Sequence, residues 1–76
     1  MKTYTFRTII EPDEKGYHGF VPLLRGVHTI GKTIEKTKKN LDEAIQCHLE
    51  GLIKDNIIPP QEQNAIEAIQ TFTIHA

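Results

Sequence analysis

The sequence contains no tryptophan, one cysteine and one methionine, and aromatic residues make up only 7% of its 76 residues. A single cysteine, Cys47, excludes an internal disulfide, and no Cys/His group has the spacing of a structural zinc site. A domain this short buries only about 60% of the surface that its unfolded chain exposes. Without a disulfide or a metal, subunit contacts are the remaining source of extra stability, so we expect self-association.

The charge is balanced and the apolar runs are short. Nine Lys and Arg against ten Asp and Glu give a net charge of −1, which is not the basic footprint of a nucleic-acid-binding domain. Lys36, Lys38 and Lys39 form a group that is typical of a solvated helix face. Apolar stretches such as residues 19–24 are too short to span a membrane, and the N-terminus has no apolar signal core. We therefore expect one cytoplasmic domain covering residues 1–76.

Alternation of apolar and polar residues predicts three strands in the first part of the chain. Residues 2–11 alternate, with Phe6 and Ile10 on one face and Ile9 on the other, as in a strand with one apolar face. Residues 12–16 place a proline, two acids and a glycine between apolar runs, which predicts a hairpin loop. Further strands are predicted over residues 17–21 and 27–30, and Gly26 and Gly31 supply turns beside the last of these.

A long amphipathic helix is predicted from Ile34 to Asp55, because apolar and small residues recur there at the spacing of one helical face. Thr33 can cap its first free N–H groups, and Glu35 lies in the first turn, where the helix dipole favours an acid. Lys54 lies at the far end, and Asn56 can adopt the left-handed conformation that stops a helix. Both helix ends are therefore specified locally.

The chain after the helix predicts a fourth strand. Pro59 and Pro60 cannot continue a helix, and an alternating pattern then runs from Ile66 to Ile74. The element order is β-β-β-α-β, with short antiparallel links and one right-handed crossover through the helix. We predict an α+β fold whose four-stranded mixed sheet has the order 3-2-1-4, with the long helix covering one face.

The second face of such a sheet has no covering layer in the monomer. Ile9, Phe20 and Ile69 are predicted to lie uncovered there or at the sheet edge. Because exposed apolar patches mark interaction sites, we expect these residues to form the contact of a homo-oligomer.

Several short motifs, taken in order, resemble the HicB antitoxin family. They are Gly16-Tyr17, Val21-Pro22, Leu24-Arg25-Gly26-Val27, Thr29-Ile30-Gly31-Lys32-Thr33 with Glu35, Asn40, Glu43-Ala44-Ile45 and Ile58-Pro59. The resemblance covers nearly the whole chain and implies a degenerate RNase H-like fold with the element order given above. It also implies a stoichiometric inhibitor of HicA, a small RNA-cleaving toxin. Full-length antitoxins of this type carry a C-terminal DNA-binding module, and because this chain stops at Ala76, direct DNA binding is not expected.

The sequence favours a non-enzymatic protein without a metal or cofactor. Two-metal hydrolysis needs several converging carboxylates, and the interior of the first predicted strand offers none. Cys47 and His48 are adjacent, so on a helix their side chains diverge by about 100° and cannot act as nucleophile and base. We expect Cys47 to lie in the core. His18 and His28 can face each other across two strands, but two ligands make a poor metal site.

Charge suggests the residues that bind a partner. An inhibitor of an RNA-binding toxin can present carboxylates where phosphate would lie. Glu11, Asp13 and Glu14 gather at the predicted hairpin, and Arg25 and His28 are expected nearby. The leading hypothesis is an antitoxin module that binds a HicA-like toxin. The alternatives are a free-standing homo-oligomeric scaffold or regulatory module without a toxin, and a residual hydrolase.

Overall fold

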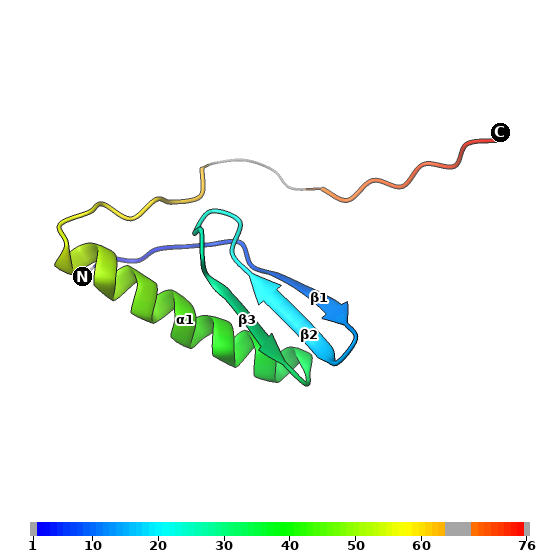
Figure 1. The fold of residues 1–76 in the computed structure, drawn as a ribbon. Helices are drawn as coiled ribbons and strands as arrows, with labels where there is room; N and C mark the ends of the chain where they lie inside the picture. The colour runs from blue at the N-terminus through cyan, green and yellow to red at the C-terminus, as the bar shows by residue number, and fades with distance from the viewer. Residues whose placement is uncertain (1, 64–67, 76) are drawn as a thin grey trace.

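The computed structural model of the protein describes residues 2–63 and 68–75. Within them the elements are β1 (Ile9–Asp13), β2 (Gly16–Phe20), β3 (His28–Gly31) and α1 (Ile34–Lys54). The strands form an antiparallel sheet in the order β1-β2-β3, and α1 packs along one face of it (Figure 1). The α+β class and the antiparallel, three-strand part of the predicted sheet are confirmed.

β1 lies further along the chain than predicted. We predicted a first strand over residues 2–11, but residues 2–8 form no strand and pairing continues through Pro12 to Asp13. β2 ends at Phe20, where the chain turns away, so residues 2–8 have no neighbouring strand with which to form a ladder. Pro12 is accepted because β1 is at the edge of the described sheet. The predicted loop 12–16 therefore shrinks to a two-residue turn, in which the Lys15 N–H donates to Asp13 Oδ1 at 2.8 Å.

β2 and β3 are each displaced by one residue from the predicted ranges, 17–21 and 27–30. The cause is a tight connection between them, in which the Leu24 N–H donates to the Val21 carbonyl and the Val27 N–H to the Leu24 carbonyl. This connection directs Val21, Leu24 and Val27 into the core, where each is at most 4% exposed. Gly26 has φ 82°, so the predicted turn at this glycine is confirmed.

α1 matches the predicted helix to within one residue, because both ends are encoded locally. Thr33 Oγ1 accepts a hydrogen bond from the Lys36 N–H at 3.0 Å, as a helix cap does. At the other end Asp55 is the C-cap, and Asn56 takes the predicted left-handed conformation with φ 58°. No helix in the described part of the chain combines the length and apolarity needed to cross a membrane.

Two glycines allow α1 to approach the sheet closely. A Cβ at Gly19 would lie 2.8 Å from Leu41 Cδ1, and one at Gly31 would lie 2.5 Å from Thr37 Oγ1. The predicted turn role of Gly31 is therefore wrong: its φ is not positive, and the residue is small because Thr37 passes over it. Leu41 is 1% exposed and Thr37 is fully buried. The Thr37 hydroxyl is satisfied because it donates to the Thr33 carbonyl at 2.7 Å.

Cys47, which we expected in the core, is exposed. α1 packs Leu41, Ala44 and Ile45 toward the sheet. At 100° per residue, position 47 then falls on the side of the helix that faces solvent. The expectation of a core cysteine was wrong because Cys47 lies just outside the apolar stripe.

The predicted fourth strand is not formed in the described residues. Residues 68–75 have no strand conformation, and Ile69, Phe72 and Ile74 are 97%, 79% and 84% exposed. The first positions of that prediction, 66 and 67, lie outside the described residues. Figure 1 shows the segment 68–75, in orange and red, running clear of the sheet and of α1. We call residues 68–75 the C-terminal segment.

Candidate functional site

The sheet face opposite α1 is the candidate interaction surface. Because Gly19 and Gly31 point toward α1, and successive residues of a strand point to opposite faces, their neighbours in β2 and β3 point the other way. We call this surface the open face; it comprises Ile9, Glu11, Asp13, His18, Phe20, His28 and Ile30.

The strand register arranges the open face in two rows. One row runs across the strands through Ile9, Phe20 and His28, and the next through Glu11, His18 and Ile30. Ile9 and Phe20 are half-buried, whereas Ile30 is 70% exposed. An isoleucine that is this exposed on a sheet face, rather than in a loop, is typical of a surface that receives a partner. Sequence reasoning named Ile9 and Phe20 as contacts and missed Ile30, although its alternation with Thr29 was the available signal.

Three rings form a stack at the centre of the open face. His18 and Phe20 have ring centroids 5.4 Å apart, and His18 and His28 have centroids 5.7 Å apart, with interplanar angles of 21° and 13°. His18 Nε2 lies 3.4 Å from His28 Nδ1. The predicted pairing of the two histidines across β2 and β3 is therefore confirmed.

The predicted partner-binding residues fall into two groups. Glu11, Asp13 and Glu14 are exposed along the second half of β1 and its turn. His28 lies in the first row of the open face, and Arg25 is exposed in the connection between β2 and β3. The turn precedes β2 and that connection follows it, so the two lie at opposite ends of this strand. The structure therefore brings Glu11, Asp13 and His28 onto one face and does not bring Arg25 next to the acids.

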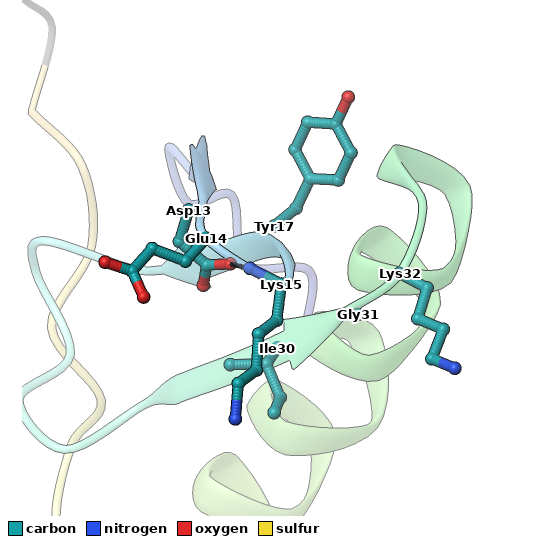
Figure 2. A pocket seen from close by; sticks show the side chains of 7 residues that line it. All are labelled: Asp13, Glu14, Lys15, Tyr17, Ile30, Gly31 and Lys32. Carbon is teal, nitrogen blue, oxygen red and sulfur yellow. Dashed lines mark hydrogen bonds between the residues drawn. The ribbon is translucent and has the colours of Figure 1, made fainter.

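A hollow of about 510 Å³ lies where the β1-β2 turn meets the end of β3 (Figure 2). Its lining residues are Asp13, Glu14, Lys15, Tyr17, Ile30, Gly31 and Lys32. Figure 2 shows the Lys15 side chain running past Ile30, whereas Tyr17 points away from both. The hollow shares Asp13 and Ile30 with the open face, so the two form one continuous surface with acids at its end.

The described residues contain no group of three or more His, Cys, Asp or Glu side chains that could hold a metal ion. His18 and His28 supply two nitrogens to the same place, which is fewer than a zinc site needs. The geometry of this surface therefore suits recognition through contact, by apolar side chains bordered by carboxylates.

Comparison with known sequences shows which family the chain resembles. Residues 6–73 match the model of the HicB-like antitoxin of bacterial toxin–antitoxin systems. The chain belongs to this family. The match includes all of the open face and the C-terminal segment as far as residue 73.

Curated relatives cover nearly the same length. A UPF0150 protein of Synechocystis is 33% identical over 67 residues, which are 87% of this chain and 85% of that protein. A UPF0150 protein of Thermotoga maritima is 40% identical over 70 residues, 90% of this chain and 91% of the relative. One of Thermoplasma acidophilum is 40% identical over 72 residues, 93% and 97% respectively. No solved structure matched the chain. Membership of the HicB-like family supports an antitoxin role, a toxin as the kind of partner, and a non-catalytic activity.

Proposed function

We propose that this HicB-like protein neutralises a HicA-like RNA-cleaving toxin by direct complex formation through the open face and the β1-β2 turn. The observation that supports this most is the group of exposed carboxylates at one end of the open face, beside the exposed Ile30. Glu11 and Asp13 lie on the open face, Glu14 stands in the turn, and Ile30 lines the hollow with Asp13 and Glu14. A toxin surface that binds RNA is basic, so carboxylates in this position attract it and fix its orientation.

Arg25 and His28 take a separate part in this proposal. They lie toward the end of the sheet away from the acids, so they would contact a different region of the toxin. A long contact of this kind is consistent with an interface of standard size, which involves about 20 residues or more on each side.

In the proposed active form, the protein has the degenerate RNase H-like fold, in which a fourth strand lies beside β1. Ile9 and Phe20 of the open face, together with Ile69 of the C-terminal segment, are the proposed homo-oligomer contacts. Exposure supports Ile69 in particular, because it is 97% exposed and burial of such a side chain contributes about 1.5–3 kcal/mol.

Neutralising the acids tests the toxin-binding proposal. In the triple variant Glu11→Gln, Asp13→Asn, Glu14→Gln, affinity for the toxin should fall about tenfold or more at low salt, because three steering charges are lost. The matched control is Asp42→Asn, Glu43→Gln, Glu50→Gln, which removes the same charge from exposed positions of α1. If a neighbouring reading frame encodes a small basic protein, the measurements are calorimetric titration with that protein and inhibition of its RNA cleavage.

Equal weakening in both triple variants would show that net charge, not the open face, controls binding. Absence of any complex between the wild-type chain and that protein would favour the alternative, a free-standing homo-oligomeric scaffold or regulatory module. The exposed Ile30 supports this alternative, because an exposed apolar side chain suits self-association equally well.

A further inference from the structure

The chain that follows α1 runs beside the chain that precedes β1. Lys2 and Tyr4 line one hollow together with residues 56–59, and the Arg7 N–H donates to Glu62 Oε1 at 3.2 Å. Residue numbers rise together along the two segments, so they run in the same direction. This is the orientation that we predicted for the strand over residues 66–74 relative to the first strand, but the residues that run parallel here are 56–62.

The C-terminal segment has no partner among the described residues of its own chain. Its residues are all exposed, and it runs clear of the sheet and of α1 (Figure 1). The radius of gyration, 15.3 Å, reflects this extension, because a compact chain of this length has a value of about 11 Å.

The C-terminal segment nevertheless has the composition of a strand. Residues 71–74 read Thr-Phe-Thr-Ile, and β-branched and aromatic residues are enriched in strands. Phe72 and Ile74 fall on one side of an extended chain, and Ile69 and Thr71 on the other. The family match extends through residue 73, so this segment is part of the domain that the family shares.

The edge of β1 that faces away from β2 is free in the described sheet. In an antiparallel ladder alternate residues direct their N–H and C=O groups to opposite sides, so only part of β1 presents hydrogen-bonding groups at this edge, and Pro12 has no N–H. On the helix side of this edge, Phe6 and Ile10 are only partly buried against the core. On the other side lies Ile9 of the open face. A strand added at this edge would extend both surfaces.

We propose that the C-terminal segment of one copy adds as a strand to the free edge of β1 in a second copy, and that the second copy does the same in return. Reciprocal exchange closes a two-fold symmetric dimer and gives each sheet its fourth strand. With the added strand parallel to β1 and Ile69 level with Ile9, Thr71 lies level with Glu11 on the open face, and Phe72 lies beside Ile10 on the helix side. The inference rests on the four-stranded sheet of the proposed function, and it names the source of the fourth strand.

Disulfide trapping in the full-length chain tests the exchange. Cys47 is exposed, so the background is Cys47→Ser. Glu11→Cys and Thr71→Cys, which the proposal places on the same side of adjacent strands, are introduced separately and then together. Oxidation of an equimolar mixture of the two single variants should give a mixed covalent dimer with twice the 8.7 kDa mass of the chain. The double variant should give the same dimeric mass. In the control, Glu43→Cys on α1 replaces Glu11→Cys and should give at most a tenth of that product.

A double variant that forms its disulfide within a monomer would show that the segment pairs with its own β1, and would overturn the proposal. No disulfide in either mixture would overturn it as well. Toxin binding by the wild-type chain is measured separately. If the toxin binds and no mixed dimer forms, the exchange fails alone; if the mixed dimer forms and no toxin binds, the proposed function fails alone.

Discussion

The two faces of the sheet are built from the same three strands and differ in the size of the residues that they carry. On the covered face, Gly19 and Gly31 leave space for Leu41 and Thr37, which are almost completely buried. On the open face the same strands carry His18, Phe20, His28 and Ile30. The covered face therefore stabilises the monomer, and the open face is available for a partner.

The largest effect that separates the faces is expected from truncating one aliphatic side chain on each. Leu41→Ala should lower the free energy of unfolding by about 2–5 kcal/mol, because a cavity replaces a side chain that is 1% exposed. Ile30→Ala should change it by less than about 0.5 kcal/mol in the monomer, since Ile30 is 70% exposed. Chemical denaturation at low protein concentration measures both. Equal losses would show that the open face is part of the monomer's core.

A smaller effect is expected at the start of the helix that makes the covered face. Thr33→Ala removes the acceptor of the Lys36 N–H and should lower the free energy of unfolding by about 1 kcal/mol. Thr33→Ser keeps an acceptor and is the matched control. An unchanged denaturation midpoint for Thr33→Ala would mean that α1 does not depend on this cap.

Self-association is measured by sedimentation equilibrium at micromolar concentration. A mass near 8.7 kDa at every concentration would contradict it.

Features that depend on contacts between residues close in sequence were predicted correctly, and features that depend on contacts between distant elements were not. α1 was placed to within one residue because Thr33, Lys36 and Asn56 fix its ends through contacts a few residues apart. β1 was misplaced because a strand exists only where a neighbour pairs with it, and β2 ends at Phe20. The assignment of Gly31 to a turn failed for a similar reason. A glycine is needed there because a larger residue would clash with Thr37, which belongs to a different element.

The candidate surface was predicted in part. Alternation placed Ile9, Glu11 and Phe20 on the face away from the helix, and the structure has them there. Ile30 was missed, because its place in the open face depends on the register between β2 and β3, in which it lies opposite His18. Arg25 was grouped with the acids by charge alone, and the length of β2 separates them.

The sequence by itself determined the order of three strands and a helix, the two ends of α1 and the resemblance to HicB antitoxins, because these depend on local propensity, capping and motifs read along the chain. Only the tertiary structure decided which residues share the open face, that His18, Phe20 and His28 stack there, and that the C-terminal segment runs clear of the sheet. The first two depend on strand register, and the last on the lack of a neighbouring strand; both are set by contacts between elements that are distant in the sequence.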